Sequence, residues 1–341
     1  MTSMQMKETS MNTNKTKTVW SRIWRGFLIF LAIIGIIAAS LFIPWNIGGL
    51  TSHSNPAQSY EEAVQRIQAL QANNESKMNP ECITQFMTHG QKTNKVIIFA
   101  HGYTSCPAQF KELGQRFYDL GYNVLIAPLP HHGLADRMTD EQGQLKAEEL
   151  AAYADQIVDI ADGLGEQITM VGFSAGGVTT AWAAQNRKDV DLAVVISPAF
   201  GFQAIPTALT APTMNMVSIL PDTFVWWDET LKTDSLPFHA YPRYSKHALA
   251  QIMRLGFAVQ SKAKQQSPAA AKILVITNAN DTSVNNILTA RVVSSWTQDG
   301  TNIKTYEFPA SLGLEHDMID PSQPNQPINI IYPKLIELIT S

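Results

Sequence analysis

The residues best placed to do chemistry lie in a short glycine-rich segment, Gly172-Phe173-Ser174-Ala175-Gly176, which matches the pattern Gly-x-Ser-x-Gly. The apolar segment 167–173 predicts a buried strand, and residues 175–186 predict a helix. A sharp turn between such elements lifts a serine hydroxyl out of the sheet, and small neighbours let the turn close. The first N–H groups of the helix then face the hydroxyl. This pattern favours Ser174 as a nucleophile, with the Ala175 N–H as an oxyanion donor; the alternative is a structural serine in a glycine-rich turn.

A second candidate segment, His101-Gly102-Tyr103-Thr104-Ser105, follows the apolar residues 95–100. A nucleophilic serine of this kind needs a second backbone donor from the loop after an earlier strand. Gly102 permits a sharp turn, and the Tyr103 N–H is the natural donor. We expect His101 to pack or to hydrogen-bond locally, and we assign it no proton chemistry.

The elements that must position these residues alternate along the chain between short apolar strands and amphipathic helices. Strands are predicted at 95–100, 123–129, 167–173, 192–197, 272–277 and 302–308. Helices are predicted at 60–71, 107–120, 145–164, 175–186, 285–298 and 329–339. Strands that are apolar on both faces and separated by helices predict an α/β fold with a mainly parallel sheet flanked by helices.

One segment, about residues 200–268, breaks this alternation because it contains no clear buried strand. It is rich in Pro, Met and aromatic residues, among them Phe224, Trp226, Trp227, Phe238, Tyr241 and Tyr244. We predict a cap inserted over the carboxyl-terminal edge of the sheet. Its apolar side chains either line a pocket for an acyl or aromatic group, with Trp226 and Trp227 near the entrance, or pack the cap onto the main domain. The low charge of the segment favours an uncharged, lipophilic substrate.

Five motifs together carry a resemblance to a known family. HGYTSCPAQF, APLPHHG, GFSAGG, NANDTS and LEHD, in that order, resemble the α/β-hydrolase superfamily. The most similar branch contains monoacylglycerol lipases, carboxylesterases and serine aminopeptidases, and the resemblance covers about residues 95–341. Many members carry Pro-Gly-His-Gly where this chain has Pro130-His131-His132-Gly133, which leaves the shape of that loop open.

The resemblance implies a catalytic triad in the chain order serine, acid, histidine. Asp281 follows the strand 272–277, where a triad acid belongs, although aspartate also favours turns and helix caps. His316 is the only histidine after Asp281, and its alternative role is that of a surface-loop histidine. Asp317 and Asp320 are rival acids, but Asp317 adjoins His316 and is poorly placed to orient its ring.

The activity that follows from these residues is that of a serine carboxylester hydrolase. Ser174 would attack a lipid-like or small acyl ester, His316 would take its proton, and Asp281 would fix the histidine tautomer. The Tyr103 and Ala175 amides would hold the oxyanion. A serine peptidase, a thioesterase or a catalytically inactive binding module with a capped pocket are the alternatives.

Composition excludes several other classes of protein. The 341 residues carry a net charge of −4, so there is no global electrostatic case for binding nucleic acid. Neither a His-Glu-x-x-His motif nor paired cysteine spacing occurs. His131 and His132, with His101, could suggest metal ligands. Adjacent histidines, however, point apart on a strand and rarely bind one metal ion together. Because Gly-x-Gly-x-x-Gly and Walker-type loops are also absent from the sequence, we expect no metal and no nucleotide cofactor.

The N-terminal part of the chain has the pattern of a membrane segment. Residues 26–45 are apolar, and no charged residue occurs between Gly26 and Tyr60. Basic residues precede the run, so the positive-inside rule predicts a cytoplasmic tail at 1–25 and a transmembrane signal anchor at 26–45. The alternatives are a signal peptide cleaved near Ala38-Ala39-Ser40 and a buried core helix.

The rest of the chain is then expected on the extracytoplasmic side of the membrane. Residues 46–94 are predicted to form a linker, rich in Gly, Ser, Asn and Pro at 46–58, and an N-terminal segment. Residues 95–341 are predicted to form the hydrolase domain. In an oxidising compartment Cys82 and Cys106 could form a disulfide, and two unpaired buried thiols are the alternative.

Overall fold

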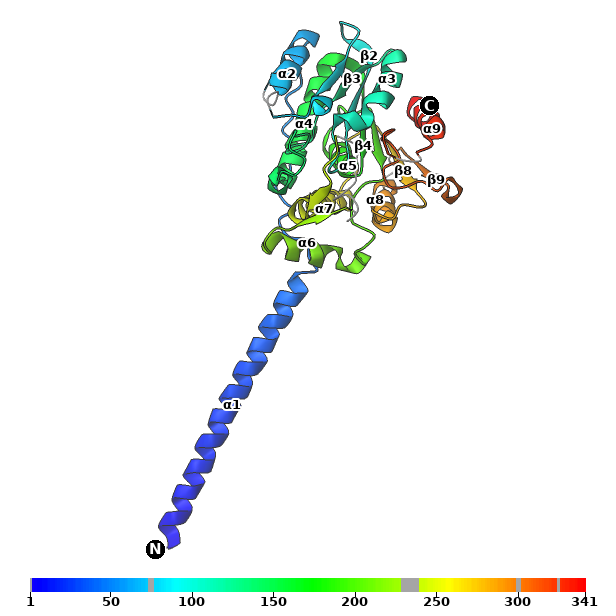
Figure 1. The fold of residues 1–341 in the computed structure, drawn as a ribbon. Helices are drawn as coiled ribbons and strands as arrows, with labels where there is room; N and C mark the ends of the chain where they lie inside the picture. Colours follow the sequence, from blue (N-terminus) through cyan, green and yellow to red (C-terminus); the bar gives the residue numbers. More distant parts are fainter. Residues whose placement is uncertain (1, 73–76, 228–238, 299–301, 324–325) are drawn as a thin grey trace. The chain divides into compact units, whose positions relative to one another are not determined.

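The structure is a computed structural model that describes residues 2–72, 77–227, 239–298, 302–323 and 326–341. The chain divides into two compact units, Met1–Ile43 and Pro44–Ser341. The first unit is built on one helix, and the second contains the sheet and the helices that cover it (Figure 1).

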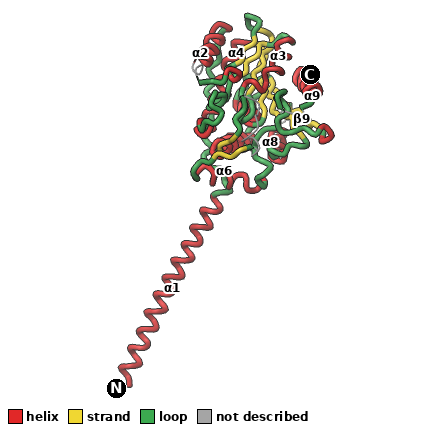
Figure 2. Tube along the Cα trace, in the orientation of Figure 1, coloured by secondary structure: helices red, strands yellow, loops and turns green. Residues whose placement is uncertain are grey.

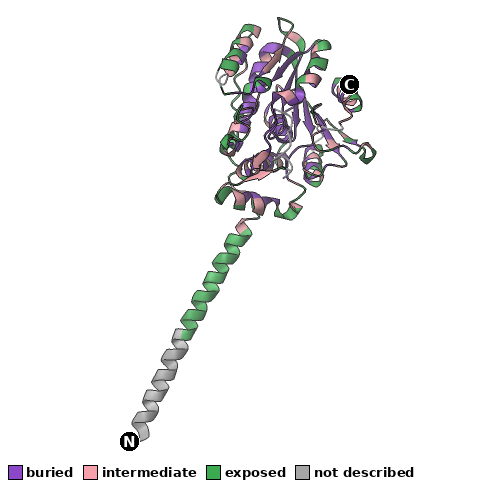
Figure 3. Ribbon diagram, viewed as in Figure 1, coloured by how far each residue is buried: buried purple, intermediate pink, exposed green. Residues whose placement is uncertain are grey.

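The first unit contains helix α1 (Thr2–Ser40). Its segment Trp20–Ser40 is long and apolar enough to cross a membrane, a criterion that signal sequences also meet. The apolar side chains of this segment are exposed, as the green part of the helix in Figure 3 shows. The helix ends at Ser40, before the predicted boundary at residue 45. The chain continues in a turn in which the N–H groups of Phe42 and Ile43 donate to the carbonyls of Ala39 and Ser40, and Pro44, which has no N–H, cannot extend the helix.

The second unit is organised around one sheet. Among the described residues this sheet has seven strands, in the spatial order β1-β3-β2-β4-β5-β8-β9. Its strands are β1 (Gln85–Met87), β2 (Thr93–Ala100), β3 (Asn123–Ile126), β4 (Gly165–Phe173), β5 (Leu192–Ile196), β8 (Lys272–Asn278) and β9 (Ile303–Phe308). All neighbouring strands pair in parallel except β1, which runs antiparallel to β3. Figure 2 shows the strands in yellow and the helices in red. The predicted α/β fold with a mainly parallel sheet is confirmed.

Helices cover both faces of the sheet, and alternate side chains of each strand contact opposite layers. In β2, Val96 and Ile98 pack with one layer, whereas Ile97 and Phe99 pack with the other. The first layer contains α2 (Tyr60–Ala72), α4 (Ala147–Leu164), α5 (Ala175–Asn186), α7 (Lys246–Ala263) and α8 (Asn286–Thr297). The second layer contains α3 (Lys111–Asp119) and α9 (Ile328–Thr340). Burial on both faces explains why the strands are apolar throughout.

The segment predicted as a cap contains several elements. It includes α6 (Thr210–Ile219), the antiparallel pair β6 (Phe224–Trp226) and β7 (Arg243–Ser245), and α7. Helix α7 belongs to the layer that covers the sheet, since its buried side chains Ala248, Ile252 and Leu255 lie in the main core. Residues 228–238 of the predicted cap, including Phe238, lie outside the described residues.

The segment 46–58, predicted as part of a linker, is fixed to the helices of the second unit. Trp182 in α5 donates a hydrogen bond from Nε1 to the Leu50 carbonyl at 3.0 Å. The backbone N–H groups of His53 and Asn55 donate to Asp155 and Asp159, at 2.6 and 3.0 Å. This part of the chain is therefore docked along α4 and α5 through backbone groups.

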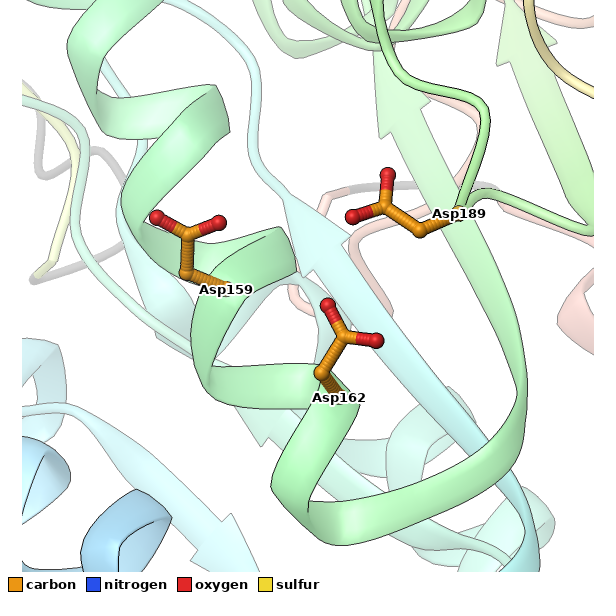
Figure 4. Close-up of side chains that lie close together, drawn as sticks. All are labelled: Asp159, Asp162 and Asp189. Atoms are coloured by element: carbon orange, nitrogen blue, oxygen red, sulfur yellow. The ribbon is translucent and has the colours of Figure 1, made fainter. Parts of the chain in front are cut away.

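Arg187, which follows α5, lies at the centre of an ion-pair network that includes the two aspartates bound by this segment. Its buried guanidinium donates to Asp155, Asp159 and Asp189, with N···O distances between 2.6 and 2.9 Å. Carboxylate oxygens of Asp159, Asp162 and Asp189 lie within 4.8 Å of one another (Figure 4). Burial and the charge of Asp189 raise the pKa of Asp162 to about 6. Arg187 supplies the positive charge that balances these carboxylates, so we interpret the cluster as one that stabilises the fold.

Candidate active site

The turn between β4 and α5 places the Ser174 side chain at the carboxyl edge of the sheet. Ser174 has φ 55° and ψ −111°, a conformation that non-glycine residues rarely adopt. A Cβ at Gly172 would overlap the carbonyl oxygen of Gly176, and a Cβ at Gly176 would overlap that of Ala100. The two glycines are therefore required because backbone segments approach each other closely on both sides of Ser174.

Three residues from distant parts of the chain form one hydrogen-bonded series. His316 Nε2 lies 3.0 Å from Ser174 Oγ, and His316 Nδ1 lies 2.8 Å from Asp281 Oδ2. The other carboxylate oxygen of Asp281 accepts the backbone N–H groups of Ser283 and Val284, at 2.9 and 3.0 Å. Burial alone would raise the pKa of Asp281, but the hydrogen bonds from His316 and the backbone lower it below its usual value. With Asp281 ionised, the proton of His316 stays on Nδ1 and Nε2 is free to accept one.

The two rival acids have other partners. Asp317 Oδ2 accepts a hydrogen bond from Gln109 Nε2 at 2.8 Å, and Asp320 Oδ2 lies 2.7 Å from His239 Nε2. Burial would lower the pKa of His239 and raise that of Asp320, but their mutual attraction reverses both shifts. Among the described residues, Asp281 is the carboxylate that is hydrogen-bonded to the His316 ring.

The loop after β2 is held by its own histidine. Gly102 O accepts the Nδ1–H of His101 at 2.8 Å and the N–H of Ser105 at 3.2 Å. His101 Nε2 in turn accepts the Leu129 N–H at 2.8 Å. Burial lowers the pKa of His101 well below its usual value, so the ring is neutral. His101 makes local hydrogen bonds, as the sequence predicts.

These contacts orient the peptide group that contains the Tyr103 N–H. In a trans peptide the N–H points opposite to the C=O, and here the Gly102 C=O is held by two donors. The His101 carbonyl accepts the Gly176 N–H at 3.1 Å, which joins this loop to the start of α5. The hydrogen bonds among described residues leave the N–H groups of Tyr103 and Ala175 unused. Both amides are therefore available to a ligand, and their role as oxyanion donors stays a prediction.

A disulfide closes the far end of this loop. Cys82 and Cys106 are bonded and buried, and Cys106 lies directly before the short helical turn Pro107–Phe110. Of the two alternatives that the sequence leaves open, the structure has the disulfide.

A cavity of about 930 Å³ opens beside Ser174 and His316. This volume is typical of a small-molecule site. Its apolar walls come largely from the segment after β5 and include Phe202, Ile205, Trp227, Tyr241, Tyr244 and Met253. Of the aromatic residues singled out from the sequence, Trp227, Tyr241 and Tyr244 line the cavity, whereas Phe224 and Trp226, in β6, are not among its lining residues.

The Pro130-His131-His132-Gly133 loop departs from the common motif at a residue with left-handed backbone. His131 has φ 64°, a conformation that glycine adopts freely. Its ring nitrogens lie 3.0 Å from Glu141 and 3.1 Å from Glu149. His132 is buried, and burial lowers its pKa to about 4. The two adjacent histidines thus have separate partners, since His132 Nδ1 lies 2.8 Å from the Pro130 carbonyl oxygen.

Two further residues contact the site without having shown a pattern in the sequence. The Phe173 ring packs on the His316 ring, with centroids 4.9 Å apart. Gln109 lies between Gly102 and Asp317 and is hydrogen-bonded to both. Phe173 lies inside the Gly-x-Ser-x-Gly motif, which hints at its position, whereas no local signal marks Gln109.

Comparisons with known proteins identify the family to which the chain belongs. The family model described as serine aminopeptidase, S33, matches residues 91–318. A thermostable monoacylglycerol lipase from Bacillus sp. (strain H-257) is 25% identical over 174 residues, which are 49% of this chain and 63% of the relative. The chain therefore matches less than two thirds of that relative's length.

Solved structures show the same fold. A structure from work on the metagenome-derived lipolytic enzymes LipS and LipT superposes with a TM-score of 0.60 at 18% identity, covering 77% of this chain and 99% of the other. The monoacylglycerol lipase of Paleococcus ferrophilus gives a TM-score of 0.55 at 17% identity, with coverages of 75% and 97%. Because the family model spans well over half of the sequence, the chain belongs to the serine aminopeptidase S33 family of the α/β-hydrolase superfamily.

Proposed function

We propose that the chain is a serine hydrolase that cleaves lipid-like or small acyl esters of carboxylic acids. The observation that carries this proposal is the hydrogen-bonded series Ser174–His316–Asp281, at 3.0 and 2.8 Å, beside an apolar cavity of about 930 Å³. A hydroxyl, a histidine and an ionised carboxylate in that order are the groups that acyl transfer to a serine requires.

The reaction follows from these positions. Ser174 Oγ attacks the ester carbonyl carbon while His316 Nε2 takes the hydroxyl proton. The carbonyl oxygen becomes an oxyanion and accepts the Tyr103 and Ala175 N–H groups. The C–O bond to the leaving alkoxide then breaks, His316 returns the proton to it, and the acyl group remains on Ser174. Water then attacks the acyl carbonyl carbon while His316 takes its proton. The bond to Ser174 Oγ breaks, His316 returns the proton to Oγ, and the acid is released. Asp281 stabilises the imidazolium in both steps.

The cavity walls favour an uncharged acyl chain. Aromatic and aliphatic side chains line the part that is formed by the segment after β5. The Bacillus relative is a monoacylglycerol lipase, which is consistent with a lipid-like substrate. We expect octanoyl esters to react faster than acetyl esters, because a longer chain buries more apolar surface. Equal rates on the two would argue against an acyl-chain pocket.

We also propose that the enzyme is attached to a membrane. Residues 26–45, which overlap the apolar span Trp20–Ser40 of α1, would act as a signal anchor, with the tail 1–25 in the cytoplasm and residues 46–341 on the extracytoplasmic side. The Cys82–Cys106 disulfide supports an oxidising compartment. In this scheme 26–45 is the anchor, 46–94 connects it to the hydrolase domain at 95–341, and about 200–268 caps the pocket. A cleaved signal peptide is the alternative, and the N-terminal mass of the mature protein distinguishes the two.

The test of the activity combines a probe with a substrate series. A fluorophosphonate probe should label the wild type, and Ser174→Ala should abolish labelling while the fold stays intact. Esters of graded chain length, amides and thioesters then define the class. Preferred cleavage of amides would indicate a peptidase, and preferred cleavage of thioesters a thioesterase. Absence of labelling in the wild type would favour a binding module.

A further inference from the structure

The side chain of Gln109 joins two loops of the site that are far apart in sequence. Gln109 is 1% exposed and lies in the helical turn Pro107–Phe110. Its Oε1 accepts the Gly102 N–H at 2.8 Å, and its Nε2 donates to Asp317 Oδ2 at 2.8 Å. We propose that Gln109 is a positioning residue that sets the separation between the Tyr103 oxyanion donor and the general base His316. The proposal rests on the serine hydrolase function proposed above.

On the side of the oxyanion loop, Gln109 completes the support of two consecutive peptide groups. The peptide between His101 and Gly102 is held at its carbonyl by the Gly176 N–H and at its N–H by Gln109. The next peptide is held at its carbonyl by His101 and presents the Tyr103 N–H on its other side. Because both peptides share the Cα of Gly102, loss of the Gln109 contact would free the Tyr103 N–H to tilt.

On the side of the histidine, Gln109 donates a hydrogen bond to the Asp317 carboxylate, which holds the turn that follows His316. Asp317 Oδ1 accepts the backbone N–H groups of Ile319 and Asp320, each at 3.2 Å, and so closes the turn. Its Oδ2 is left for Gln109. Movement of the Asp317 carboxylate would therefore move the backbone that carries the His316 ring.

The chemistry of the amide suits this position. Burial and the charge of Asp320 raise the pKa of Asp317, so the site does not favour additional negative charge. An amide accepts from Gly102 and donates to Asp317 without carrying charge. A glutamate would keep the acceptor but place a second carboxylate against Asp317. The charged and titratable groups that face this pair are Asp320, His316, His239 and Tyr332.

The first test replaces Gln109 with a side chain of similar length that forms no hydrogen bond. We expect Gln109→Met to lower kcat for 4-nitrophenyl butyrate by about 10- to 100-fold, since a displacement near 1 Å can cost that much. KM should stay within about twofold, because the apolar walls formed by the segment after β5 are unchanged. A role confined to packing would lower Tm and leave kcat per folded molecule intact, so Tm is measured alongside.

The second test uses pH and remains informative if the methionine variant folds poorly. In Gln109→Glu, the two facing carboxyl groups can share one proton at low pH, which restores a donor between them. The ratio of variant to wild-type kcat/KM should therefore rise as pH falls from 8 to 5. A structural role predicts a ratio that does not change with pH.

Gln115 provides the matched control. It lies in α3, is exposed, and donates from Nε2 to Asp119 at 2.8 Å, so Gln115→Met and Gln115→Glu remove the same type of hydrogen bond outside the cavity. Both should keep wild-type kcat at every pH. Wild-type kcat in folded Gln109→Met, or a pH-independent ratio in Gln109→Glu, would overturn the positioning role while ester hydrolysis by the wild type still stands. An inactive wild type would overturn the proposed function and this role together.

Discussion

Replacing Asp281 by asparagine should stop turnover and leave the fold almost unchanged. Asp281 Oδ1 accepts two backbone N–H groups, from Ser283 and Val284, and Oδ2 accepts the His316 Nδ1–H. An asparagine would keep its carbonyl oxygen toward the two backbone donors, which turns its NH₂ group toward His316. The ring would then carry its proton on Nε2 and could not accept the proton of Ser174. In a serine protease the same change lowers kcat about 10⁴-fold, equivalent to about 5.5 kcal/mol of barrier.

The comparison with Asp281→Ala separates activity from stability. Alanine leaves the N–H groups of Ser283, which is half-buried, and Val284, which is buried, without their acceptor, and the buried group alone costs about 1–3 kcal/mol. We therefore expect Asp281→Asn to keep near wild-type stability in urea denaturation and Asp281→Ala to lose it, while both lose activity on 4-nitrophenyl butyrate. An asparagine variant that retained more than a tenth of wild-type kcat/KM would refute the reasoning about the tautomer.

Two further predictions concern stability. Arg187→Met leaves the carboxylates of Asp155 and Asp159 buried without their cation, so the free energy of unfolding in urea should fall by about 3–5 kcal/mol; a loss below 1 kcal/mol would contradict this. His239→Asn removes a pair in which the pKa of His239 is raised and that of Asp320 is lowered. Its contribution is largest between about pH 4 and 6.5 and is lost as pH rises through the folded pKa of His239 or falls through that of Asp320. The destabilisation should thus be greater at pH 5.5 than at pH 9, and a pH-independent difference would count against an ion pair.

The sheet and its helices could be predicted from the sequence because burial on both faces leaves a strong local pattern. The helix predicted at 175–186 has those bounds in the structure, and the strand predicted at 272–277 ends one residue later. Strand β1 was missed because its three residues are only half-buried at the sheet edge. The docking of 46–58 was also missed, since it depends on backbone N–H groups that bond to aspartates of α4, which composition does not reveal.

The positions of the candidate site residues were predictable because the motifs mark the carboxyl ends of strands. Ser174, Asp281 and His316 each follow a strand of a parallel sheet, so they meet at one edge. Their catalytic roles remain predictions. Gln109 could not be found in this way, because its partner Asp317 is 208 residues away and the contact exists only in the folded chain.

The central claim is that Ser174 carries the acyl group during turnover. The most direct measurement mixes the full-length protein with 4-nitrophenyl butyrate, quenches the reaction in acid within the first turnovers, and locates the bound butyryl group by peptide mass spectrometry. Our account predicts one butyryl group per chain on Ser174 in the wild type and none in Ser174→Ala, which should also fail to hydrolyse the ester. Hydrolysis that persists in Ser174→Ala, or a butyryl group carried by another residue in the wild type, would contradict it.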